Sequence, residues 1–391
     1  MKKIGFLLVG LMLAATTAFG AEEAKKDMPP AKWDFSESNV EFKAYLYNSQ
    51  SGAIKMGKDE DFILKVKKQL DEKTWISFKY DTDDSNPDTK IEVIVNRKFN
   101  EYLEAQLDMD LVTADGSGID LREDDDSEKV FIKYTPNNKL AVKFNPYDID
   151  LEVGDEYNTK DTKGSMVVPG LQMEYKLSDT MMVYGGLGAA KATDTKGTAD
   201  KTDDKDKTAL GLKAGFENKT GNSSLIGMFA INTQDDKNIA APSPIKMAAN
   251  LRGSYKSGNI SVKGEVLATK LNKAAGMKDE KGEIIDSTDF ALYAKAGYKM
   301  GTMTPYIAGR YIGGSVYFDD DDYCAILKDT DTPLHGGLTS IEAGSEFELT
   351  GGLKIVPYVE FLNAKEEIFK DSDGNAKKST VTLNTKVKVT F

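Results

Sequence analysis

The sequence predicts an all-β chain that folds as a closed antiparallel transmembrane β-barrel of about eighteen strands. Three observations predict this fold. From position 40 onward the chain reads as segments in which apolar and polar residues alternate, which is the two-residue period of a strand. The connections between these segments switch regularly between tight turns and long acidic stretches. The N-terminus has the pattern of an export signal, so the chain is expected to leave the cytoplasm.

Residues 1–20, MKKIGFLLVGLMLAATTAFG, are expected to form a cleaved signal peptide. Two lysines precede an apolar run from Ile4 to Ala15, and small residues lead to the expected cleavage before Ala21. An uncleaved membrane anchor is the alternative, but the run is short for a spanning helix, which needs about 20 residues. Residues 21–38 are then a short periplasmic segment, and residues 39–391 form the barrel.

Composition excludes several function classes. The formal net charge is -12, and it becomes -14 when Lys2 and Lys3 leave with the signal, so nucleic acid is not an expected partner. The single cysteine excludes an intramolecular disulfide, and the single histidine excludes a metal cluster built on histidine and cysteine. We expect no cofactor and no catalytic site. A hydrolase site would have to use His335 in a glycine-rich loop, where no residue resembles an activated nucleophile.

The strands follow from the alternation. In DFILKVKKQL the apolar positions include Phe62, Leu64 and Val66, and in TKIEVIVNRKF they include Ile91 and Val93. Strands are expected over residues 39–49, 60–71, 73–82, 89–99, 101–113, 127–135, 138–146, 166–176, 180–191, 206–217, 222–233, 245–256, 258–271, 286–299, 302–315, 338–349, 352–365 and 378–391.

Two kinds of connection join these strands. Tight turns rich in turn-forming residues are expected at 71–73, 100, 136–138, 178–179, 218–222, 257–259, 301 and 351–352. Long acidic connections are expected at 50–59, 83–88, 114–126, 147–165, 192–205, 234–244, 272–285, 316–337 and 366–377. Membrane barrels join their strands by short periplasmic turns and longer external loops, whereas a soluble sandwich has no reason to keep this rule.

Aromatic residues end the strands that run toward the tight turns, except the first of them, which ends on Leu70. Each lies in the parity of its strand's apolar face, and the set is Phe99, Tyr134, Tyr175, Phe216, Tyr255, Tyr298, Phe347 and Phe391. Aromatic rings settle at the boundary between hydrocarbon and headgroups, so this set is expected to form a girdle at one membrane surface. Cross-strand aromatic packing in a soluble sheet is the alternative, although it does not explain why the rings gather at one end.

The chain resembles the outer-membrane β-barrel porins of Gram-negative bacteria. The resemblance rests on the signal peptide, the alternation across residues 40–391, the turn rule and the final strand VTLNTKVKVTF, which ends in phenylalanine. It implies contact with outer-membrane lipids and lipopolysaccharide, and insertion by the barrel-assembly machinery through the C-terminal strand. It also implies passive diffusion of small hydrophilic solutes. Porins with sixteen strands are common, so sixteen is the alternative count, and both a monomer and a homotrimer remain open.

The resemblance further implies that the third external loop folds into the lumen. In this chain that loop is residues 114–126, ADGSGIDLREDDD, and its candidate constriction residues are Asp120, Arg122, Glu123, Asp124, Asp125 and Asp126. The longer fourth loop, residues 147–165, is the alternative for this role.

A barrel of this size leaves an aqueous channel. The residues that alternate with each strand's apolar positions point inward and are expected to line this channel. The expected pore-lining residues are Lys65, Lys67, Lys79, Lys90, Glu104, Asp108, Asp110, Lys129, Lys133, Lys143, Lys213, Arg252, Lys263, Arg310, Glu342 and Glu346. Basic residues gather on some strands and acidic residues on others, which predicts an electric field across the channel that selects ions by charge. The alternative is that these charges only keep the channel interior hydrated. The sequence therefore predicts a porin for ions and small hydrophilic solutes. A barrel acting mainly as an adhesin or structural anchor is the alternative.

Overall fold

The computed structural model describes residues 33–34, 39–48, 54–82, 90–113, 119–122, 130–145, 170–194, 205–232, 245–271, 288–313, 337–365, 367, 369–370 and 375–390. In this part of the chain, no helix has the length and apolar character needed to cross a bilayer.

The described residues form one antiparallel sheet of 20 strands and a separate two-stranded hairpin. The first half of the sheet contains β1 (Trp33–Asp34), β2 (Asn39–Asn48), β3 (Ile54–Asp71), β4 (Thr74–Thr82), β5 (Lys90–Lys98), β6 (Leu103–Thr113), β7 (Ile119–Arg122), β8 (Phe131–Tyr134), β9 (Leu140–Asn145) and β10 (Gly170–Lys176). The second half contains β11 (Met181–Asp194), β12 (Lys205–Lys219), β13 (Ser223–Asn232), β14 (Ile245–Ser257), β15 (Ile260–Leu271), β16 (Thr288–Tyr298), β17 (Met303–Ile312), β18 (Leu338–Glu348), β19 (Leu353–Ala364) and β22 (Ser379–Thr390).

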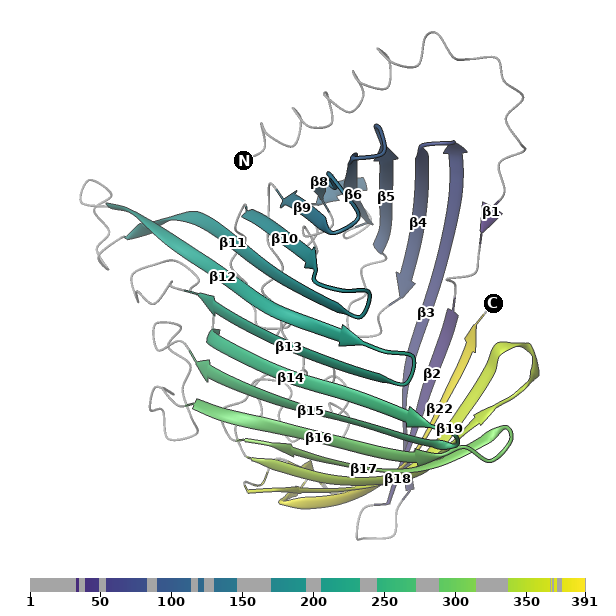
Figure 1. Ribbon diagram of the computed structural model, residues 1–391. Coiled ribbons are helices and arrows are strands. Elements are labelled where there is room, and N and C mark those ends of the chain that lie inside the picture. Colours follow the sequence, from purple (N-terminus) through teal and green to yellow (C-terminus); the bar gives the residue numbers. More distant parts are fainter. Residues whose placement is uncertain are drawn as a thin grey trace.

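Strands that are neighbours in sequence are also neighbours in the sheet. The pairing runs from β2 through β6, from there to β8, and on through β19. The last strand, β22, pairs with β19 on one side and with β2 on the other. Figure 1 shows β11 to β19 side by side in one strongly curved sheet, with the turns after β10, β12 and β14 at the same end of the strands.

The expected strands are confirmed, and the structure adds short elements that the alternation did not reveal. Without β1 and β7, eighteen strands remain of the 20 in the sheet, which agrees with the expected count rather than with sixteen. Strand β3 begins at Ile54, six residues before the expected 60, because its first part pairs with β2 as a continuous hairpin. Strand β7 and the hairpin of β20 (Phe369–Lys370) with β21 (Ala376–Lys377) lie within expected long connections.

The tight turns form where the sequence predicts them, and in several of them a side-chain oxygen binds nearby backbone N–H groups. The Asn100 Oδ1 accepts from the N–H of Leu103 at 2.9 Å, and the Asn137 Oδ1 accepts from Leu140 at 3.0 Å. The turns after β14 and β16 instead use Gly258 and Gly301, whose φ angles of 56° and 63° suit glycine.

Alternation gives the sheet two different faces. The apolar face carries large hydrophobic side chains that remain exposed, among them Leu171, Met173, Leu251, Val266, Phe290 and Ile341. The polar face carries the residues between them, such as Arg252 beside Leu251 and Glu265 beside Val266, and it holds most of the ion pairs described below. In a water-soluble sheet the apolar side chains would be the buried ones, so this distribution is inverted.

Candidate functional site

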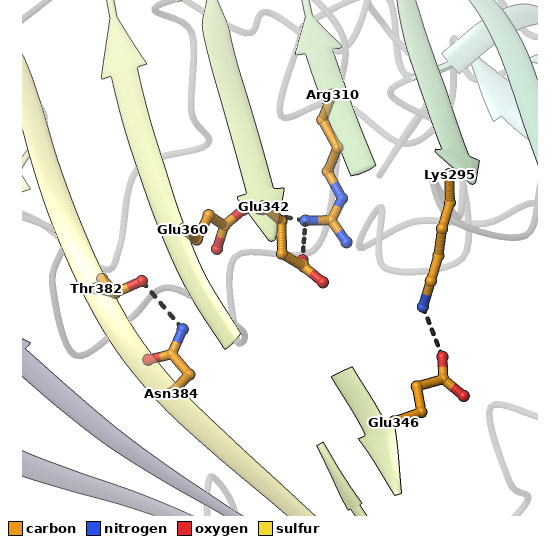
Figure 2. Close-up of polar contacts among 7 residues, drawn as sticks. All are labelled: Lys295, Arg310, Glu342, Glu346, Glu360, Thr382 and Asn384. Atoms are coloured by element: carbon orange, nitrogen blue, oxygen red, sulfur yellow. Dashed lines mark hydrogen bonds and ion pairs between the residues drawn. The ribbon is translucent and has the colours of Figure 1, made fainter. Parts of the chain in front are cut away.

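An arginine bridges two carboxylates on the polar face of β17, β18 and β19. The Arg310 Nη1 lies 3.3 Å from the Glu342 Oε2 and 3.0 Å from the Glu360 Oε1, as Figure 2 shows. Glu342 and Glu360 lie directly opposite each other in the strand register. Their side chains are only 11% and 4% exposed, so the two like charges need a shared cation nearby.

A second network lies nearer the tight turns. The Glu346 carboxylate accepts from the Lys295 Nζ at 2.8 Å, and its other oxygen lies 2.5 Å from the Lys354 Nζ. The Lys295 Nζ also lies 3.7 Å from the centre of the Tyr306 ring. One carboxylate thus holds lysines from two different strands, β16 and β19, and a tyrosine from β17 packs against one of them.

Uncharged polar side chains lie around these networks on the polar face of the sheet. The Asn250 Nδ2 donates to the Glu265 Oε1 at 2.6 Å, and the Asn384 Nδ2 donates to the Thr382 Oγ1 at 3.0 Å (Figure 2). Among the described residues, the buried oxygens Asn250 Oδ1, Thr269 Oγ1, Ser340 Oγ and Asn384 Oδ1 have no hydrogen-bond partner. The protein therefore does not use the full hydrogen-bonding capacity of this face.

Aromatic rings on the polar face lie beneath cationic groups. The Lys98 Nζ lies 5.5 Å from the Trp75 ring centre, and the Lys143 Nζ lies 4.6 Å from that of Phe131. Tyr293 has the Lys263 Nζ at 5.0 Å and the Arg310 guanidinium carbon at 5.3 Å. These rings hold the long basic side chains close to the sheet, so they help to fix the positions of the positive charges.

The register brings many of the expected pore-lining residues onto this one face. Lys65 lies directly opposite Lys79, Lys133 lies opposite Lys143, and Arg252 lies opposite Glu265. The Lys133 Nζ is 4.0 Å from the Glu104 Oε1. Lys67, Lys213, Lys263, Arg310, Glu342 and Glu346 occupy the same face by register. The side chains of Lys90, Asp108 and Asp110, and all of Lys129, lie outside the described residues, so their roles stay predictions.

The expected constriction residues are described only in part. The backbones of Asp120 and Arg122 belong to β7, which pairs with β6 as a hairpin, and Asp120 lies opposite Val112. Glu123, Asp124, Asp125 and Asp126 lie outside the described residues, as does the alternative loop of residues 147–165. Which loop narrows the interior stays a prediction.

The described residues expected to form the aromatic girdle lie beside the tight turns and belong by register to the apolar face; that they meet a membrane surface stays a prediction. Tyr134, Tyr175, Tyr255 and Tyr298 are exposed, and Phe99, Phe216 and Phe347 are half-buried; Phe391 lies outside the described residues. Phe216 packs over Gly227, where any larger side chain would collide with the Phe216 ring. The exposed Tyr102 adds a ring in the turn before β6, and its hydrogen bond to the Glu101 carboxylate raises the pKa of its hydroxyl.

The polar face also contains an apolar row that sequence analysis missed. Five residues that lie side by side in the register form it: Leu267, Ala291, Ile312, Leu338 and Ala364. Each of them is at most 3% exposed, so protein covers the row. Parity places its members on this face, since Leu267 shares the parity of Glu265, and Leu338 shares that of Glu342, but only the register aligns them in one row.

No family model matches the chain, and no curated protein does. Among solved structures, the chain is similar to the outer-membrane OmpT of Vibrio cholerae, with 10% identity, 93% of this chain and 98% of that chain covered, and a TM-score of 0.45. It is similar to the outer membrane channel DcaP of Acinetobacter baumannii, with 12% identity, 92% and 97% covered, and a TM-score of 0.44. It is also similar to OmpF of Salmonella typhi, solved with daunomycin, with 9% identity, 92% and 97% covered, and a TM-score of 0.46.

Proposed function

We propose that the chain is an outer-membrane porin, a closed β-barrel whose interior lets ions and small hydrophilic solutes diffuse passively. The observation that carries this proposal is the inverted distribution of the two faces. Large apolar side chains such as Leu171, Met173 and Leu251 are exposed, while the charged networks around Arg310 and Glu346 lie on the opposite face. An apolar exposed face suits hydrocarbon, and a charged face suits a water-filled interior.

The strand pairings support closure of the barrel. β22 pairs with both β19 and β2, and β2 pairs with β3, so the first and last long strands of the sheet have partners on both sides. Closure matters in lipid, because an unpaired sheet edge would leave backbone N–H and C=O groups without hydrogen bonds. At about eighteen strands, a closed barrel is too wide for side chains to fill and leaves an aqueous channel.

Conductance across a planar lipid bilayer tests the proposal. Purified, refolded full-length protein is expected to produce discrete current steps that persist at low voltage. An adhesin or structural anchor with a plugged interior would insert without producing steps, and a soluble exported protein would remain in solution without detergent. Either result would reject the channel.

A further inference from the structure

Phe369 is a buried aromatic residue in a connection between strands. It belongs to the hairpin of β20 and β21, between β19 and β22, and it is 1% exposed. Connecting segments usually run over the surface of a protein with their side chains in solvent. Phe369 pairs with Lys377 across the hairpin, but two strands of two residues each are too short to bury a phenylalanine between them. Protein outside the hairpin therefore covers the Phe369 ring.

The base of the hairpin is fixed to the sheet on both sides. The Lys365 N–H donates to the Gly337 carbonyl at 3.1 Å, and the Ala364 N–H donates to the Lys378 carbonyl at 2.7 Å. Phe369 lies five positions after Ala364, and an extended chain rises about 3.3 Å per residue, so the two Cα atoms are at most about 17 Å apart. The Phe369 ring is thus held within reach of the adjoining ends of β18, β19 and β22.

The exposure of β19 indicates which face of the sheet the Phe369 ring covers. On the apolar face, Phe361 is 46% exposed, and Asn363, nearer to the hairpin, is exposed as well. On the polar face, Leu362 is 0% exposed, and Ala364, which ends the apolar row, is 3% exposed. A ring packed on the apolar face would have covered its neighbours there. The covered neighbours of Phe369 in β19 belong instead to the polar face.

We infer that the hairpin of β20 and β21 turns inward over the polar face and narrows the channel at the end of the strands away from the tight turns. This inference rests on the proposed channel. The Phe369 ring packs there against Leu362 and Ala364. The constriction is thereby assigned to the connection between β19 and β22, rather than to residues 114–126 or 147–165. Because the sheet holds the hairpin at both ends, the narrowing is a lasting part of the channel and limits the size of the hydrophilic solutes that pass.

Single-channel conductance of the full-length protein in a planar bilayer tests the inference. Phe369→Ala removes the ring that holds the hairpin over the polar face, and it should raise the conductance by roughly 1.5-fold or more, because the narrowest cross-section widens. Phe369→Leu keeps an apolar side chain at this position and should stay close to the unmodified protein. Phe361→Ala is the matched control, because it removes the same ring from the exposed face of β19 and should leave the conductance unchanged.

Thiol labelling measures the cover of the polar face directly. In a Cys324→Ser background, a cysteine placed at Ala364 should react slowly with a membrane-impermeant thiol reagent in reconstituted protein. Adding Phe369→Ala should make this reaction several times faster, and adding Phe361→Ala should not.

The two measurements separate a failure of the constriction from a failure of the channel. Current steps of unchanged size in Phe369→Ala, or equal labelling of the cysteine with and without Phe369, would overturn the hairpin constriction and leave the channel standing. A complete absence of current steps in the unmodified protein would instead reject the channel itself.

Discussion

Replacing Arg310 with leucine is expected to destabilise the folded sheet by about 3 kcal/mol. Removing one partner of a buried ion pair costs about 3–5 kcal/mol, because it leaves an uncompensated charge out of water. Here two carboxylates lose their shared cation, and the Glu342 and Glu360 side chains are 11% and 4% exposed. The Arg310 side chain is 21% exposed, so some water already reaches the site, and the lower end of that range applies.

Urea unfolding of the protein in lipid vesicles, followed by tryptophan fluorescence, measures this loss. Lys299→Leu is the control, because its ion pair with Glu348 is exposed, at 44% and 57%, and should contribute less than about 1 kcal/mol. Adding Glu342→Gln and Glu360→Gln to Arg310→Leu should recover most of the lost stability. A loss under about 1 kcal/mol for Arg310→Leu, or no recovery in the triple variant, would refute the reasoning.

Two further predictions concern the close contacts and the apolar face. Gly344→Ala should cost about 1–3 kcal/mol in the same unfolding measurement, because its Cβ would lie 2.6 Å from the Tyr358 Cβ, whereas Gly221→Ala, with nothing within 4 Å, should be neutral. A tryptophan at Tyr255 should be quenched by brominated lipid much more than a tryptophan at Ser254, because adjacent strand residues point to opposite faces. Equal costs for the two glycine variants, or equal quenching at the two tryptophan sites, would contradict these assignments.

The strands could be predicted because their signal is local. Every second residue in a segment such as Phe290 to Tyr298 is apolar, and a chain segment with this period fits a sheet that has two different surroundings. The turns were equally readable, since Asn100, Asn137 and Ser178 act through their own neighbouring N–H groups. The hairpin of β20 and β21 was missed because its strands have two residues each, too few to show any period.

The partners within the polar face could not be predicted, because they depend on strand register. Parity places Arg310, Glu342 and Glu360 on one face, but only the register shows that one guanidinium reaches both carboxylates. The burial of residues on the polar face could not be predicted from the alternation either. Inward parity suggested contact with water, whereas Leu267 and Ile312 on that face are covered. Cover of this kind comes from segments far apart in the sequence, so no local period encodes it.

Cysteine scanning of β10 tests the central claim most directly, namely that one face of the sheet meets lipid and the other meets water. With Cys324 replaced by serine, a single cysteine is placed in turn at each residue from Leu171 to Tyr175 in protein reconstituted into vesicles. A membrane-impermeant thiol reagent should label the cysteines placed at Gln172 and Glu174. A lipid-borne quencher should reach fluorescent probes attached to the cysteines placed at Leu171, Met173 and Tyr175. Uniform labelling at all five positions, or an inverted pattern, would contradict a water-filled barrel in a membrane.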